Sequence, residues 1–211
     1  MVLELEYLKL EYNENLEELV SEIKKELEEK TEKIISFFAI VNFKITLKIF
    51  DSSFEFKKEY LNNNSHYQTI EEIPDWVCGF ALNKIIYVLS LEEFRKIEGN
   101  ENLQKEDLVK LIIHEFVHLC EDYCYPQDKY LWISEGMATY LAKQYENDAT
   151  IVFDADLNEL LEDNATYSNN YLLFKYAYET YGKSYIIKLL KNSDLLEKET
   201  IKLYQELKKV V

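Results

Sequence analysis

Hydrophobic and polar residues follow a strand-like period in parts of the first half of the chain. Strict alternation over residues 41–49 places every second side chain on one face, which predicts a strand. Alternation over residues 2–12 slips phase midway, and we interpret this segment as one strand with a bulge. Residues 76–82 and 84–90 predict two further short strands, joined by a turn at Asn83.

Helical spacing dominates the remainder of the sequence. Asn13 or Asn15 is expected to cap the first helix, and Asp51 or Ser52 the second. Gly182 is typical of a residue that ends a helix. The helices are predicted to run up to about residue 38 and over residues 51–61, 104–123, 129–145, 156–162, 168–181, 183–191 and 195 to the end.

The order of these elements, with strands and one long helix before a run of helices, predicts an α+β fold. We expect a small mixed sheet in an N-terminal α/β part over residues 1–125 and a helical part over residues 126–211. A length of 211 residues predicts a single domain, and the hydrophobic share of 47% is ample for its core.

The chain is strongly acidic, with a formal net charge of −16. Such a surface repels nucleic acids and anionic membranes, so neither is expected as a partner. The charge is expected to maintain solubility, although it also favours cationic substrates. The sequence has neither a recognisable signal peptide nor a membrane-spanning run, and its three cysteines are expected to be reduced thiols in the cytoplasm.

The segment from His114 to His118 carries the chemistry, because it reads H-E-x-x-H within a predicted helix. Residues four apart on a helix lie one turn above each other, so the two imidazoles can converge on one point. Glu115 lies between them in angle. The pattern favours a Zn²⁺ site with two nitrogen ligands and a carboxylate base, although helix histidines beside a surface glutamate are the alternative.

A catalytic zinc site typically has a third protein ligand. Glu135 is the best candidate, because it lies among apolar and small residues, and Gly136 is expected to let two helices approach closely enough to share a metal. Glu121 lacks such a context. Cys120 and Cys124 are expected to point away from the metal, because they lie about 200° and 240° around the helix from His118.

The motif followed after 16 residues by E-G-x-A, with a tryptophan three residues before the glutamate, resembles the gluzincin zinc metallopeptidases. The resemblance is closest to the peptidase MA-like family and more distant to aminopeptidase N-type enzymes. It covers about residues 3–182. It implies a zincin-like fold, in which an edge strand lies beside the zinc-binding helix, and it implies Zn²⁺ held by His114, His118 and Glu135 with Glu115 as general base.

The resemblance also implies an oxyanion-binding tyrosine downstream. Counting back from Gly182 to the position that this tyrosine has in the family favours Tyr167, with Tyr171 and Tyr176 as alternatives. Gly79, Phe80 and Ala81 resemble the family's edge strand, to which a substrate peptide can add through backbone hydrogen bonds, with Gly79 admitting the substrate backbone. Packing of this strand in a plain hairpin is the alternative. The glutamate of the aminopeptidase G-x-M-E-N segment is missing, which argues against aminopeptidase specificity.

The expected function is therefore zinc-dependent hydrolysis of peptide bonds in a peptide or protein substrate. A non-catalytic zinc-binding or regulatory module that retains the fold is the alternative, and a zinc ion that only staples two helices is another. The presence of Glu115 between the two histidines favours an enzyme. Oligomeric state and cleavage specificity stay open.

Overall fold

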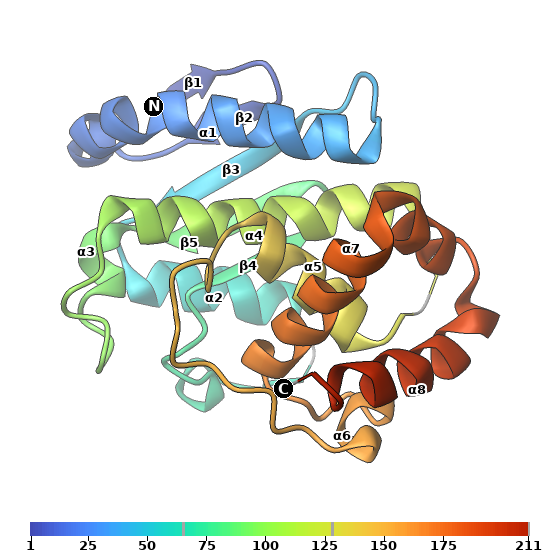
Figure 1. Cartoon of the computed structure of the whole chain (residues 1–211). Coiled ribbons are helices and arrows are strands. Elements are labelled where there is room, and N and C mark those ends of the chain that lie inside the picture. The colour runs from blue at the N-terminus through green and yellow to red at the C-terminus, as the bar shows by residue number, and fades with distance from the viewer. Residues whose placement is uncertain (65, 128, 211) are drawn as a thin grey trace. The chain divides into compact units, whose positions relative to one another are not determined.

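The computed structural model describes residues 1–64, 66–127 and 129–210, and it confirms the α+β class. The chain divides into two compact units, Met1–Cys120 and Glu121–Val211. The sheet belongs to the first unit, and the second is helical (Figure 1). That the whole chain forms one domain stays a prediction. The predicted C-terminal helix includes Val211, which lies outside the described residues.

The described part of the first unit forms a mixed five-stranded sheet in the order β1-β2-β3-β5-β4. The three central strands are parallel neighbours, whereas each outer strand pairs antiparallel with the strand beside it. β4 is therefore an edge strand. The bounds are β1 (Val2–Glu4), β2 (Leu8–Glu11), β3 (Ile45–Phe50), β4 (Gly79–Leu82) and β5 (Ile85–Leu89).

The prediction of one bulged strand over residues 2–12 is wrong. β1 and β2 form a tight antiparallel hairpin in which Leu3 pairs with Leu10. The backbone N–H of Leu5 donates to the Leu8 carbonyl across the turn at 2.8 Å. The phase slip in the sequence thus marks a reversal of the chain. The turn lets the residues before and after it form two paired strands, each with its own alternation.

The strand predicted over residues 41–49 begins later, at Ile45. Ala39 and Asn42 both adopt positive φ, at 54° and 58°, which an extended strand does not allow. Val41 is 76% exposed as a result. The turn between β4 and β5 is confirmed: Asn83 and Lys84 have φ of 51° and 64°, as a two-residue hairpin turn requires.

The long helices of the first unit end within about two residues of their predicted ends. Ser52 caps α2 by accepting from the Glu55 N–H, as predicted. Asn13 and Asn15 do not cap α1, because their side-chain amides donate to the Asp51 carboxylate instead. The short helix α3 was not predicted. The bounds are α1 (Glu17–Phe38), α2 (Ser53–Asn63), α3 (Leu91–Phe94) and α4 (Lys105–Cys124), with 3-10 turns at Glu14–Leu16 and Ile70–Glu72.

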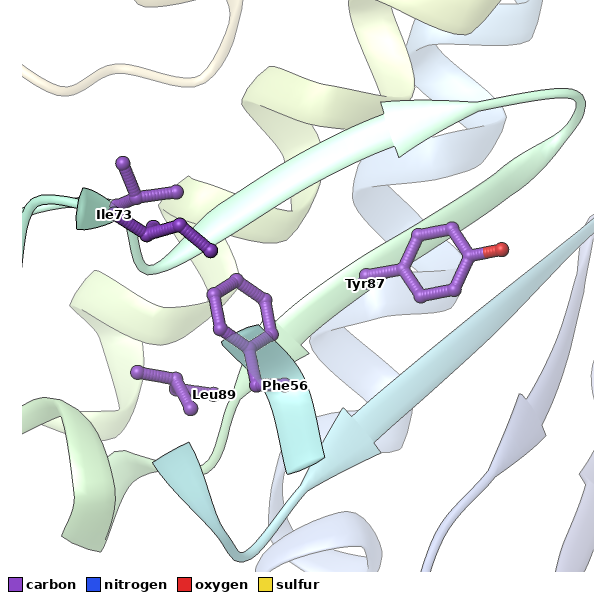
Figure 2. Close-up of a cluster of buried hydrophobic side chains, with 5 residues drawn as sticks. Phe56, Ile73, Tyr87 and Leu89 are labelled. Carbon is purple, nitrogen blue, oxygen red and sulfur yellow. The ribbon is translucent and has the colours of Figure 1, made fainter. Parts of the chain in front are cut away.

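The two faces of the sheet pack against different helices. Leu47 pairs with Ile86 and Ile49 with Val88 on one buried face, and α1 and α4 lie in front of the strands in Figure 1. The opposite face carries an aromatic cluster around Phe56 of α2 (Figure 2). The buried members of that cluster are Phe56, Ile73, Val77, Tyr87 and Leu89.

The second unit is built from α5 (Leu131–Leu141), α6 (Leu157–Leu161), α7 (Tyr167–Leu190) and α8 (Leu196–Leu207), with a 3-10 turn at Ser193–Leu195. Gly182 interrupts α7 with a φ of 78°, which confirms the predicted break between two helical segments. None of the described helices is both long and apolar enough to cross a membrane.

α5 is shorter than the predicted 129–145 helix and is fixed at several points. The Asp163 carboxylate accepts from the Leu131 N–H at 2.7 Å, so a residue distant in sequence caps the helix. The Trp132 indole N–H donates to the Thr200 hydroxyl of α8 at 2.8 Å. Lys143, with a φ of 62°, follows the last turn.

Gly136 permits close contact between α5 and α7. A Cβ at this position would meet the backbone carbonyl oxygen of Asn170 and lie 2.7 Å from the Phe174 Cβ. The sequence suggested that Gly136 lets two helices come close enough to share a metal. In the structure, the close approach at Gly136 is between α5 and α7.

Gly136→Ala is expected to lower the free energy of unfolding by about 1–3 kcal/mol, since the new methyl group collides with backbone that cannot yield locally. Denaturant unfolding measures the change. Gly79→Ala is the control, because its new methyl group would meet only the Leu111 side chain at 3.2 Å, which can adjust. Equal stability of Gly136→Ala and wild type would contradict the assigned packing.

Candidate metal centre

α4 holds the H-E-x-x-H motif in a rigid setting. Its first three turns are almost wholly apolar on the buried side, and each buried aliphatic or aromatic side chain contributes about 1.5–3 kcal/mol. The helix therefore fixes the direction of the polar side chains that it carries. The fully buried apolar residues around the motif are Leu108, Val109, Ile112, Ile113, Phe116, Val117 and Cys120.

His114 and His118 converge as the four-residue spacing predicts. Their Nε2 atoms lie 3.1 Å apart, and their ring centroids are 4.7 Å apart with the ring planes at 77°. Two nitrogen ligands at about 2.0–2.1 Å from a tetrahedral zinc ion lie about 3.3 Å apart, so the observed spacing suits a shared ion. In a metal-free protein, one ring N–H can donate to the other ring's lone pair at this distance. His114 is buried and His118 half-buried.

Glu135 of α5 is the third member of a group that could hold a metal ion. One ligand atom each from His114, His118 and Glu135 lies within 4.8 Å of the other two. Two imidazole nitrogens and one carboxylate oxygen form a three-ligand set typical of catalytic zinc, which leaves a position for water. The donor set of this group thus fits Zn²⁺, and it contains no cysteine.

The Glu115 charge acts on Cys78, the residue directly before the edge strand β4. Burial and then the negative charge of Glu115 raise the pKa of the Cys78 thiol to about 12. The Leu111 side chain, one turn before Glu115 on α4, lies against Gly79. The chain that enters β4 therefore runs beside the face of α4 that carries Glu115.

The three residues predicted to bind substrate have close neighbours within the first unit. The Leu111 side chain lies close to Gly79, where an added Cβ would meet it at 3.2 Å, and the approach of a substrate backbone to Gly79 stays a prediction. Phe80 stacks on Tyr87 with 4.4 Å between ring centroids. Ala81 pairs with Ile86 of β5. Peptide binding along β4 stays a prediction, and it would rest on the backbone groups of this edge.

Tyr167 is the first residue of α7 and is 53% exposed. The alternative Tyr171 is buried, with its ring centroid 5.5 Å from that of Tyr145 and 6.1 Å from that of Tyr140. Tyr176 is half-buried. Of the three, Tyr167 offers the most accessible phenol, and its catalytic role stays a prediction.

Sequence reasoning missed Glu121, which is fully buried although its sequence context is polar. Its Oε2 accepts a hydrogen bond from the Ser134 hydroxyl at 2.6 Å, and its Oε1 lies 3.6 Å from the Lys129 ammonium. The available signal was its spacing: a residue seven after His114 and three after His118 lies on the same face of a helix.

Comparison of the chain with protein-family models, curated proteins and solved structures gave no match.

Cys78 is expected to react with an alkylating reagent at pH 8 at least about 100-fold more slowly than an unstructured thiol, because a thiol with so high a pKa is almost wholly protonated there. The rate should keep rising as the pH increases beyond 10. The measurement uses metal-free protein in which Cys120 and Cys124 are replaced by alanine.

A variant that keeps only Cys124 serves as the comparison. Burial also raises the pKa of Cys124, but its environment includes no Glu115 charge. A Cys78 that reacts at the rate of an unstructured thiol would contradict the burial of this thiol and its location near Glu115.

Proposed function

We propose that this protein is a zinc-dependent metallopeptidase with a zincin-like fold, and that His114, His118 and Glu135 hold the ion. The observation that carries the proposal is the grouping of these three donors within 4.8 Å. The 3.1 Å separation of the two imidazole nitrogens on one rigid helix supports it. Resemblance of the H-E-x-x-H and E-G-x-A segments to gluzincin peptidases supplies the reaction class.

The bound ion would supply Lewis acidity to the scissile carbonyl and to the attacking water. Glu115 takes a proton from that water and passes it to the leaving amine, since it projects from the same helix between the two histidines. In this proposal an extended peptide adds to β4 at the edge of the described sheet through backbone hydrogen bonds. Tyr167 donates its phenol to the oxyanion in this proposal.

A non-catalytic zinc-binding or regulatory module remains the alternative function. Such a module needs the three ligands but has no use for a carboxylate base between them. The two alternatives therefore differ in what Glu115 does, while both require zinc. The proposed substrate is a peptide or protein in the cytoplasm, and neither nucleic acid nor a membrane is a proposed partner.

Purified wild-type protein is expected to contain about one zinc ion per chain, and Glu135→Ala well below that, because two imidazoles alone hold the ion weakly. Elemental analysis after dialysis measures the content. Glu162→Ala is the matched control, since Glu162 is an exposed glutamate of the same unit. A folded wild-type protein that takes up no zinc from metal-replete buffer would contradict the proposal.

Glu115→Gln is expected to keep its zinc and to lose peptide hydrolysis by about 100- to 10,000-fold, because it removes the base and leaves the ligands intact. Cleavage of a peptide library followed by mass spectrometry measures the activity. Glu106→Gln changes an exposed glutamate on the same helix and should match wild type.

Two results would count against an enzyme. Wild type that binds zinc but cleaves no member of the library favours the binding module. Cleavage by Glu115→Gln at the wild-type rate would remove Glu115 from the proposed chemistry.

A further inference from the structure

A buried carboxylate lies at the start of the second unit, outside the three-ligand group. The exposed fraction of the Glu121 side chain is only 1%, and that of the nearby Lys129 side chain is 8%. Burial of a carboxylate carries a large desolvation cost unless hydrogen bonds and opposite charge offset it. Ser134 supplies the hydrogen bond at 2.6 Å, and Lys129 supplies the charge at 3.6 Å.

This arrangement joins two helices at a defined point. Glu121 belongs to the last turn of α4, and Ser134 to the first turn of α5. Ser134 directly precedes Glu135 in sequence, so a bond that fixes Ser134 also fixes where α5 presents Glu135. Lys129 comes from the segment that connects the two helices and lies 3.7 Å from Asp122 as well.

Helix geometry relates Glu121 to the histidine pair. Glu121 lies seven residues after His114, which corresponds to a rotation about 20° short of two full turns. Glu121 therefore lies on the same face of α4 as both imidazoles. Glu121, which accepts the hydrogen bond from Ser134, therefore continues along α4 the stripe that carries His114 and His118.

We propose that Glu121, acting through Ser134, is a positioning residue that sets the place of Glu135 in the zinc site. The inference rests on the zinc site proposed above. The Ser134–Glu121 bond is charge-assisted, so it is shorter and stronger than a bond between neutral groups. It fixes the first turn of α5, directly before Glu135.

The test compares the zinc affinity of wild type, Ser134→Ala and Ser134→Thr by competition with a chelating fluorophore. Ser134→Ala removes the donor and is expected to raise the zinc Kd by about 10-fold, the scale on which outer partners of ligands act. Ser134→Thr keeps a hydroxyl and is expected to stay close to wild type. Unfolding of the zinc-free forms gives their stabilities.

Tyr185→Phe is the matched control. It deletes another hydroxyl-to-carboxylate bond of 2.7 Å, from Tyr185 to Glu199, which joins α7 to α8 in the same unit. A comparable loss of stability with an unchanged zinc Kd is expected. If the zinc Kd instead rises in every variant in step with the loss of stability, Ser134 acts only as a structural contact, and the inference is overturned.

The outcomes separate this inference from the proposed function. Wild type without zinc would overturn both. Wild type with zinc, together with unchanged affinity in Ser134→Ala, would overturn only the positioning role. Should Ser134→Ala not fold, Glu121→Gln replaces it, since that variant keeps an acceptor but loses the charge. Its Kd is then expected to rise severalfold, and an unchanged Kd would overturn the inference.

Discussion

The candidate site depends on the close packing of α4. Fully buried apolar side chains from Leu108 to Val117 cover about half of its circumference, so the helix has little freedom to rotate or fray. The four-residue spacing on this helix therefore places the two imidazole Nε2 atoms 3.1 Å apart. A catalytic metal site needs this kind of preorganisation, because ligands that must be gathered on binding reduce the affinity for the ion.

The first unit uses the same helix to arrange the neighbourhood of Glu115. Leu111 fits against Gly79, and one turn further along, the Glu115 carboxylate influences the Cys78 thiol. Gly79 is also the first residue of the edge strand β4. A single stripe of α4 thus relates a general-base candidate to a strand at the edge of the described sheet.

The second unit fixes Glu135 by packing of a different kind. Gly136 lets α5 approach the backbone of α7, and the Trp132 indole reaches Thr200 of α8. The residues on either side of Glu135 are therefore occupied with holding α5 in place. The E-G-x-A segment and the preceding tryptophan, which suggested a peptidase in the sequence, serve packing first.

The sequence by itself determined the α+β class, the helical setting of H-E-x-x-H and the β4–β5 turn, because local spacing and turn residues specify each of them. It misjudged the first strand, since a phase slip looks alike in a bulge and a hairpin. It could not reveal the burial of Glu121 or the partner of Gly136. Only the tertiary structure decided these, because they depend on contacts between helices distant along the chain, and no local pattern encodes which neighbour fills the space beside a residue.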